Sequence, residues 1–161
     1  MDTSVTAKTL DYAAAAIVRC RRGKLKVLLM KTVKVKGQNA GLELWQLIGG
    51  MEEIVDQGNP LRTLNEELQE EAGLSLRENY PDPELIHIQA MPDGHTRRFY
   101  LVWREGLRGE LRKQAILDGA FKRLESPEWR TVDFAKKNLC ESHRAVLDYL
   151  IDLDLKHKGL R

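Results

Sequence analysis

The sequence predicts a fold of the α/β or α+β class, in which strands and helices pack as a sandwich. Strand-like runs fill the first third of the chain and recur in its second half, whereas two amphipathic helical segments lie far apart, at residues 60–72 and 141–156. The length of 161 residues corresponds to one domain, which could bury roughly 70% of the surface of its unfolded chain. We therefore expect a single domain over residues 1–161, with flexible polar residues 1–9 at its start.

Composition and charge limit the classes of function. Apolar residues make up 42% and charged residues 31% of the chain, as in ordinary globular proteins. The net charge of +2 is too small to indicate nucleic-acid binding, so we expect no nucleic-acid partner. The apolar run at residues 13–18 is far shorter than the ~18 residues of a membrane span and ends at Arg19, so we expect a cytoplasmic protein without membrane attachment. Cys20 and Cys140 lack metal-binding spacing and are expected to be buried thiols.

The first half of the chain is expected to begin with a β-hairpin. Apolar runs on either side of the basic turn at residues 21–24 indicate two strands, and a third strand follows a glycine-containing loop. The expected strands span residues 12–20, 24–33 and 42–48, and the loop spans residues 34–42. The third strand leads to Gly49 and Gly50, which suit a tight bend where backbone approaches a ligand; a plain turn is the alternative.

Residues 60–72 are expected to form an amphipathic helix. Asn59 can cap its N-terminus, Pro60 suits its first turn, and Gly73 is placed to end it. A stripe of apolar residues at helical spacing faces the expected core: Leu61, Leu64, Leu68 and Ala72.

The second half is expected to contain three more strands and the second helix. The strands span residues 85–91, 97–104 and 129–134, with a turn at Asp93-Gly94 and a loop that begins at residues 106–109. The helix over residues 141–156 has one apolar side, formed by Ala145, Val146, Tyr149, Leu150 and Leu153.

Four carboxylates crowd the end of the first helix, at Glu66, Glu67, Glu70 and Glu71. Glu67, Glu70 and Glu71 would share one helical face, because residues three and four apart are neighbours. Like charges at these spacings repel by roughly 0.2–0.5 kcal/mol per pair, and Arg62 is the only cation in the helix. A hard divalent cation such as Mg²⁺ would remove this repulsion and prefers oxygen ligands. A solvated acidic face is the alternative, although such faces normally mix charges of both signs.

Residues 67–74, Glu-Leu-Gln-Glu-Glu-Ala-Gly-Leu, together with Gly49-Gly50 upstream, resemble the Nudix box. The resemblance implies a Nudix-like α/β/α sandwich with a mixed central sheet. It also implies a hydrolase that cleaves the pyrophosphate linkage of a nucleoside diphosphate derivative, with Mg²⁺ or Mn²⁺ as cofactor and a small nucleotide as substrate. A homodimer is left open, because dimers are common among relatives.

The first half of the box departs from the family pattern. Glu66 stands where the family has Arg, and Ile48 stands where a proline often precedes the glycines. The segment from Gly50 to Glu67 is two residues longer than the pattern. The equivalents of the first acidic position are Asp56 by direct count, and otherwise Glu53 or Asn59. These departures leave a second interpretation open, a catalytically weak or inactive Nudix-fold module that binds a nucleotide or a protein.

Several carboxylates receive roles from the resemblance. The implied metal ligands are Glu67, Glu70, Glu71 and the backbone of Gly50 or Gly49, and Glu70 and Glu71 would also act in catalysis. A general base in this family is often a carboxylate on a downstream loop. Glu128 and Glu125 are the candidates, and Glu110 and Asp118 rank behind them. The alternative for each of these four is an exposed surface charge.

Basic and aromatic side chains are candidates for substrate contacts. Arg97 and Arg98 could bind phosphate oxygens, but neighbours on a strand point to opposite faces, so at most one is expected to serve. Candidates for stacking on a base are Trp45, Tyr100 and Trp103, with core packing as the alternative for the last of these. His95 follows a predicted turn and is expected to be an exposed loop residue.

Overall fold

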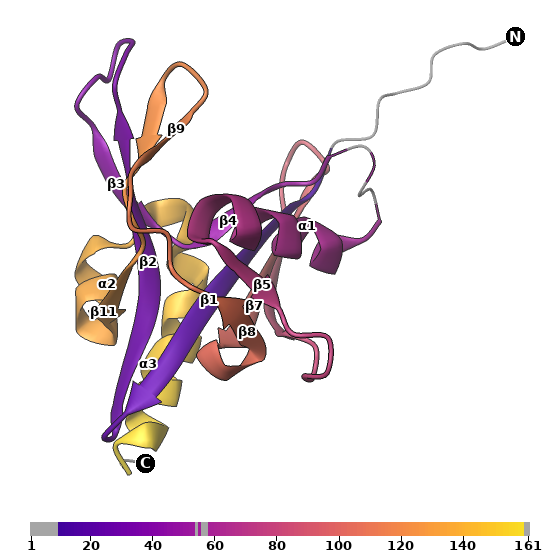
Figure 1. Ribbon diagram of the computed structural model, residues 1–161, viewed down its shortest axis with the longest axis vertical. Helices are drawn as coiled ribbons and strands as arrows, with labels where there is room; N and C mark the ends of the chain where they lie inside the picture. Colours follow the sequence, from indigo (N-terminus) through magenta and orange to yellow (C-terminus); the bar gives the residue numbers. More distant parts are fainter. Residues whose placement is uncertain (1–9, 54, 56–57, 160–161) are drawn as a thin grey trace, which may run out of the picture.

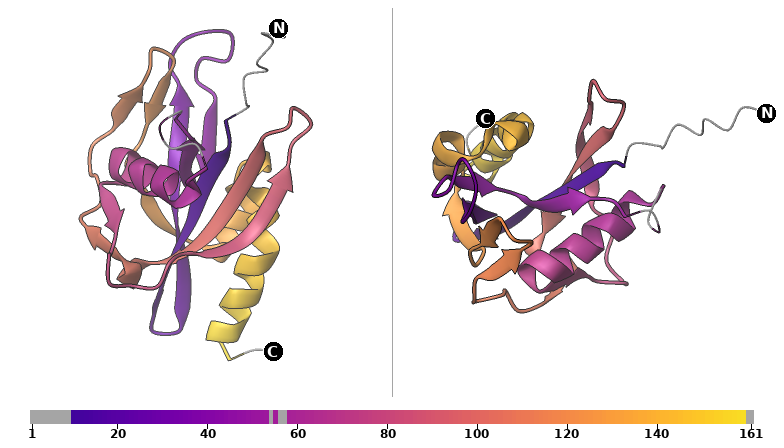
Figure 2. Two further views of the ribbon diagram at one scale, coloured as in Figure 1. Left: turned by 90° about the vertical axis from the view of Figure 1, so that its right-hand side faces the viewer. Right: turned by 90° about the horizontal axis from the view of Figure 1, so that it is seen from above.

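Helices on both faces of a twisted β-sheet give the molecule three layers, as Figures 1 and 2 show. The computed structural model describes residues 10–53, 55 and 58–159. The strands are β1 Tyr12–Arg21, β2 Lys24–Lys34, β3 Glu43–Gln46, β4 Ile48–Met51, β5 Leu74–Leu76, β6 Glu84–Ala90, β7 Thr96–Trp103, β8 Leu107–Gly109, β9 Ile116–Asp118, β10 Lys122–Leu124 and β11 Glu128–Thr131. The helices are α1 Pro60–Glu67, η2 Leu68–Ala72, η3 Arg104–Gly106, α2 Val132–Asn138, η4 Glu141–Val146 and α3 Leu147–His157. The α/β/α sandwich expected from the sequence is confirmed.

The large sheet is mixed and has nine strands within the described residues. Its main order is β6-β7-β1-β2-β10-β9, with β3 and β11 also paired to β2, and β4 paired to β1. Strands β1 and β7 run parallel, with Tyr12 in register with Arg97. Strands β5 and β8 form a separate antiparallel pair. The parallel pair places the first residues of β1 and β7 side by side, which matters for the cleft described below.

Strand β1 is buried on both faces and lies at the centre of the molecule. One set of its side chains packs in the core beneath α1 and the other packs in the core beneath α2 and α3: Ala13, Ala15 and Ile17 in the first, and Ala14, Ala16 and Val18 in the second. Because successive side chains of a strand point to opposite faces, this one strand contributes to both cores.

The acidic helix lies over one face of the sheet, and its expected ends are confirmed. Asn59 Oδ1 accepts a hydrogen bond of 3.2 Å from the Arg62 backbone N–H, so it caps α1 as predicted. Gly73 follows η2 in the left-handed conformation at φ 77°, which glycine adopts without steric cost. Leu64 and Leu68 are fully buried against the sheet.

The opposite face is covered by α2, η4 and α3, and here one expectation is wrong. The strand expected over residues 129–134 ends at Thr131 in β11, and helix α2 begins at the next residue. Thr131 Oγ1 accepts a hydrogen bond of 3.1 Å from Phe134 N–H, so a threonine N-cap turns the chain into a helix. The second expected helix is present, but its first part, Glu141–Val146, is a 3₁₀-helix.

The expected third strand is divided in two. Strand β3 pairs with β2, whereas β4 pairs with β1 after a break at Leu47. The short strands β5, β8, β9 and β10 were not expected from the sequence. Residues 1–9 and the candidate Asp56 lie outside the described residues. Within the described chain, no helix is long and apolar enough to span a membrane.

Candidate active site

A cleft of about 570 Å³ opens where the acidic helix faces β4, β9 and the first residues of β1 and β7. Carboxylates in its lining are Glu67, Glu70, Glu71 and Asp118. Other polar side chains in its lining include Tyr12, Arg97 and His143. The cleft therefore combines an acidic group with hydrogen-bond donors that suit an anion.

The glycine pair brings the backbone of β4 against the acidic helix. Gly49 N–H donates a hydrogen bond of 3.0 Å to Glu71 Oε1. A Cβ at position 50 would collide with the carboxylate of Glu67, so glycine allows this close approach. Both glycines pair with β1 as members of β4, and the tight bend expected from the sequence is therefore wrong. An extended strand, rather than a turn, presents the backbone to the carboxylates.

The last turn of the acidic helix is a π-helix, which divides the carboxylates into two environments. Helix α1 ends at Glu67, and residues 68–72 continue with the wider π-type turn, a feature found frequently at functional sites. Glu71 is only 8% exposed and Glu67 is half-buried, whereas Glu70 is exposed. Glu67 and Glu71 thus meet the glycine pair, and Glu70 lines the solvent-exposed part of the cleft.

Burial and mutual repulsion favour the protonated forms of Glu71 and Glu67. Burial first, and then the charge of Glu67, raises the pKa of Glu71 to about 8, although the hydrogen bond from Gly49 opposes this. Burial, followed by the charges of Glu70 and Asp118, raises the pKa of Glu67 to about 7. Two carboxylates that share a desolvated site in this way are stabilised by a positive charge placed between them.

The donor chemistry of this site fits a hard divalent cation, but the ligands are not yet gathered into a finished metal site. Carboxylate oxygens are preferred by Mg²⁺, and an ion would replace the protons that Glu67 and Glu71 otherwise retain. Among the described residues, no three His, Cys, Asp or Glu side chains converge closely enough to form a metal-binding group. Glu67 and Glu71, with Glu70 and the main chain of Gly50, are the residues that would hold the ion.

His143 and Tyr12 form a hydrogen-bonded pair in the cleft lining. Leu47 N–H donates to His143 Nδ1 at 3.0 Å, and His143 Nε2 lies 2.8 Å from the Tyr12 hydroxyl. Burial, with a smaller effect of Arg97, lowers the pKa of His143 to about 4, so its ring is neutral at pH 7. Because Nδ1 accepts, the single ring proton is on Nε2 and is donated to the Tyr12 oxygen. The hydroxyl proton of Tyr12 is thus free to be donated to a ligand in the cleft.

Arg97 lies beside Tyr12 and is held by a second histidine. Its guanidinium lies 5.6 Å from the centre of the Tyr12 ring, and its Nε–H donates to His95 Nε2 at 3.4 Å. His95 in turn bonds to Asp93 through Nδ1. The expectation that His95 is exposed is wrong, because the side chain is buried between these two partners. Arg97 therefore enters the cleft from a fixed position.

The other nominated substrate residues lie elsewhere. Arg98 pairs with Asp11 at 3.1 Å and is absent from the cleft lining. Trp45 packs edge-on against Phe134, at 5.1 Å between ring centres, on the side of the sheet covered by α2. The remaining two aromatic candidates, Tyr100 and Trp103, pack in or against the cores.

One of the four nominated base candidates lines the cleft. Asp118, at the end of β9, is close enough to raise the pKa of both Glu67 and Glu71. Glu128 instead pairs with Arg130 at 3.1 Å on β11, and it is not part of the cleft lining. The other two candidates also lie outside it: Glu125 pairs with Arg123 at 3.0 Å, and Glu110 lines a different hollow.

Tyr12 and His143 were not nominated from the sequence. They are 131 residues apart, and neither stands in a recognisable motif. The only local signal for Tyr12 is a polar aromatic at the start of an apolar strand, which is a common arrangement.

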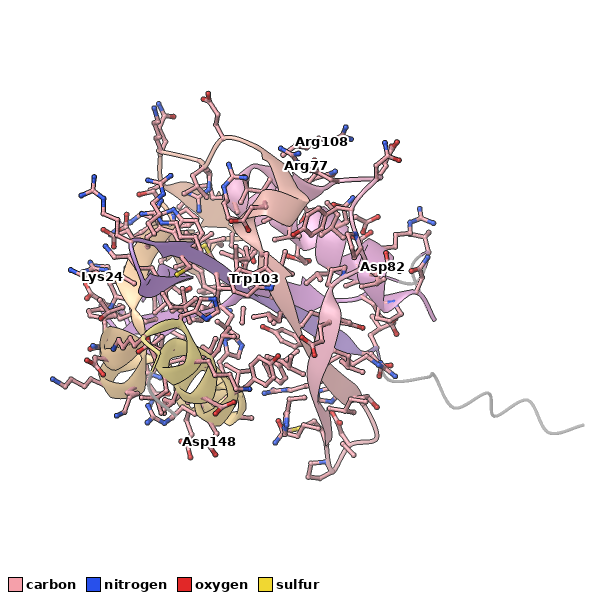
Figure 3. The ribbon with its side chains drawn as sticks, turned by 90° about the horizontal axis from the view of Figure 1, so that it is seen from below. Lys24, Arg77, Asp82, Trp103, Arg108 and Asp148 are labelled. Carbon is pink, nitrogen blue, oxygen red and sulfur yellow. The ribbon has the colours of Figure 1, made fainter. Side chains whose placement is uncertain are left out.

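A smaller hollow of about 240 Å³ lies beside the end of β7, among Arg77, Asp82 and Trp103. Figure 3 labels these residues on the side chains seen from below. No acidic-helix residue contributes to this hollow, so the larger cleft is the candidate active site.

Comparisons with known proteins bear on the family and the fold of the chain. The profile of the NUDIX domain matches residues 10–150. No curated protein matches the chain in sequence. Among solved structures, a MutT NUDIX hydrolase from Burkholderia pseudomallei is 23% identical, with a TM-score of 0.59 over 88% of this chain and 97% of that one. A MutT structure from a study of Aliivibrio salmonicida and Vibrio cholerae is 16% identical, with a TM-score of 0.64 over 91% and 99%. The NUDIX domain of Shewanella oneidensis NrtR, in a cocrystal with ADP ribose, is 16% identical, with a TM-score of 0.63 over 95% and 93%.

Proposed function

This chain belongs to the Nudix family, and from that membership we propose that it hydrolyses the pyrophosphate linkage of a nucleoside diphosphate derivative with the help of Mg²⁺ or Mn²⁺. The observation that supports this most is the buried pair of Glu67 and Glu71 held against Gly49 and Gly50. A small nucleotide is the partner proposed for the cleft. The single domain, the cytoplasmic location and the homodimer stay predictions.

The donors in the cleft suit the phosphates of such a substrate. The guanidinium of Arg97 can bind phosphate oxygens, because arginine presents paired N–H groups to an oxyanion. The hydroxyl of Tyr12 can donate to a second oxygen, since His143 already supplies the hydrogen bond that the Tyr12 oxygen accepts. We assign substrate binding to Arg97 and Tyr12, and we no longer assign it to Arg98 or Trp45.

Hydrolysis needs a base in addition to bound phosphates. The oxygen of water forms a bond to one phosphorus, the bridging oxygen leaves with the other phosphate, and a base accepts a proton from the water. A divalent cation held by the glutamates would neutralise phosphate charge and lower the pKa of the water. Glu70 and Asp118 both line the cleft, and we propose one of them as the base in place of Glu128.

The test is turnover of a panel of nucleoside diphosphate derivatives with and without Mg²⁺. Glu71→Gln keeps the shape of the side chain but removes the charge, and we expect turnover to fall at least about a hundredfold, because metal ions contribute several kcal/mol to such reactions. Glu78→Gln, at an exposed loop position, is the matched control and should retain full turnover.

Two further variants decide between Asp118 and Glu128 as the base. If Asp118→Asn abolishes turnover while Glu128→Gln retains it, the base lies in the cleft as proposed. The reverse result would return the role to Glu128. Turnover that is unaffected by chelator or by Glu71→Gln would contradict the proposed metal dependence.

A binding module is the second candidate function, and two observations favour it. Glu66 replaces the family Arg and pairs with Arg62 at 3.5 Å, and the described carboxylates do not form a finished metal group. Nucleotides that raise the melting temperature without being hydrolysed at any metal concentration would support this function over the enzyme.

A further inference from the structure

The hairpin that joins β1 to β2 carries a regular array of positive charge. Arg19 is directly opposite Lys26, and Arg21 is directly opposite Lys24, in the antiparallel register. Residues two apart on a strand point to the same face, so these four cations share one face of the sheet. We call them the hairpin array. Like charges directly opposite each other destabilise a strand pair, so folding alone does not favour this arrangement.

The array faces away from the helix that covers the hairpin. Cys20 and Leu25, which alternate with the array, pack against the core beneath α3. Gly23, at the hairpin turn, lies near the His157 carbonyl at the end of that helix, and Figure 1 shows the hairpin end beside α3. The array therefore occupies the uncovered face at this end of the sheet. Figure 3 looks onto this end of the molecule and labels Lys24.

The turn adds a fifth cation at an unfavourable backbone position. Arg22 has φ 54°, in the left-handed region that Gly, Asn or Asp adopts at lower cost. A strained residue at an exposed turn is a recurrent feature of functional surfaces. Within the described chain, neither Arg22 nor any member of the array forms an ion pair.

The positive surface continues into a hollow that contains an aromatic ring. Arg19 and Arg21 line both a hollow of about 180 Å³ at the hairpin and a neighbouring hollow of about 580 Å³. Further cations in the second hollow are Lys113 and two arginines, Arg104 and Arg112, whose guanidinium groups already donate to backbone carbonyls and so add positive charge more than free donors. The carboxylate in the described lining of this hollow is Glu110. The Arg19 guanidinium lies 4.4 Å from the centre of the Trp129 ring, which also lines the hollow.

We propose that the hairpin array and the hollow beside Trp129 bind single-stranded nucleic acid. Clustered arginines suit phosphate groups, and a basic groove with an aromatic ring is the recurrent design of sites that bind single strands. A membrane surface fits less well, because the site is concave and the exposed large apolar side chains of the described chain do not line it. The net charge of +2 concealed this surface, because the acidic cleft and the basic hairpin nearly cancel in the sum.

The hairpin array is remote from the active site, and the hollow approaches it only at Arg112, whose Nε–H donates to the backbone carbonyl of Glu71 at 2.8 Å. Nine residues of extended strand, at about 3.3 Å each, place Arg21 roughly 30 Å from Tyr12. Substitutions in the array therefore leave the cleft intact, and binding of nucleic acid does not depend on the hydrolase proposal.

The test is fluorescence anisotropy of a labelled single-stranded oligonucleotide of about 16 nucleotides, which covers the usual site size. Chelator is present, so that metal in the cleft does not contribute. Four phosphate contacts predict that the logarithm of the binding constant falls with the logarithm of salt concentration with a slope of about −3. Arg21→Gln with Lys24→Gln should weaken binding about tenfold or more at low salt and reduce the slope by about 1.4.

The matched control is Lys136→Gln with Lys137→Gln, which makes the same change in net charge at exposed positions of α2. This control should bind the oligonucleotide as tightly as the unaltered protein does. Both double variants should have the same melting temperature as the unaltered protein. Equal losses in the two double variants would overturn the proposal, as would no detectable binding. Tighter association with phosphatidylserine vesicles or with polyglutamate would assign the surface to another partner and also overturn it. Nucleotide turnover, measured on the same variants with Mg²⁺ in place of chelator, reports on the hydrolase proposal independently.

Discussion

The acidic cleft and the hairpin array both crowd charges of one sign onto neighbouring elements, and they differ mainly in burial. In the cleft, Glu71 is nearly inaccessible to solvent, and its pKa is raised to about 8. At the hairpin, Arg21 and Lys24 are exposed. When like charges lie close together in a buried site, the protonation state of the groups changes. When they lie close together on the surface, the groups stay charged and attract counter-ions. A run of like charge in a sequence therefore predicts different chemistry in the two settings.

The largest effect should be a pH dependence of the free energy of unfolding that arises in the cleft and not at the hairpin. When the pKa of a carboxylate is higher in the folded protein than in the unfolded chain, the protein loses stability as pH rises between these two pKa values. The reason is that the unfolded chain releases the proton at a lower pH than the folded protein does. Between pH 6.5 and 8, Glu71 should lower the free energy of unfolding of the metal-free protein by about 1–2 kcal/mol. Urea unfolding at several pH values measures this.

This window avoids the opposite effect of His143. Its pKa is lowered to about 4, so it costs stability as pH falls from 6.5 toward 4 and contributes no change above 6.5. Glu71→Gln should flatten most of the decline, and Mg²⁺ should raise stability more at pH 8 than at pH 6.5. A decline that persists in Glu71→Gln and is insensitive to Mg²⁺ would mean that burial of this carboxylate is not its source.

A smaller effect is expected from charge reversal at the hairpin. Arg21→Glu converts a repelling cross-strand pair with Lys24 into an attractive one, and the free energy of unfolding should rise by about 0.2–1 kcal/mol at low salt. The gain should shrink at high salt, because exposed charges are screened. A loss of stability at low salt would show that the array does not carry the repulsion assigned to it.

The smallest effect is expected at the outer edge of the acidic helix. Glu66→Gln removes one of the weaker charges that raise the pKa of Glu67, but it also removes the partner of Arg62. These two effects oppose each other, so stability should change by less than about 0.5 kcal/mol. Turnover close to that of the unaltered protein would confirm that Glu66 lies outside the metal site, and a large loss would place it inside.

Local signals predicted the fold well where they were complete. Asn59 and Gly73 marked both ends of the acidic helix, and the hairpin turn followed from its glycine. Helix α2 was missed because Trp129, Val132 and Phe134 are also good strand formers, and the threonine cap that decides the matter is a single residue.

The candidate site was only partly predictable, because its geometry depends on tertiary contacts. The glutamates and glycines stand in a short motif, and the cleft contains them. The π-helix that separates Glu70 from Glu71 has no sequence signal in this segment. The positions of Tyr12 and His143 depend on a hydrogen bond between residues far apart in the chain. The sequence offered no signal that favoured Asp118 over Glu128 as the base. Asp118 lies in the cleft because strand β9 leads there.

Strand β1 has a consequence for how the two ends of the molecule work together. It carries Tyr12 at one end and Arg21 at the other, and packing on both faces of its middle keeps it from bending or shortening. It acts as a fixed spacer, so a mononucleotide cannot reach both ends at once. Only a ligand longer than the strand could bridge them, and each end can be altered by mutation without disturbing the other.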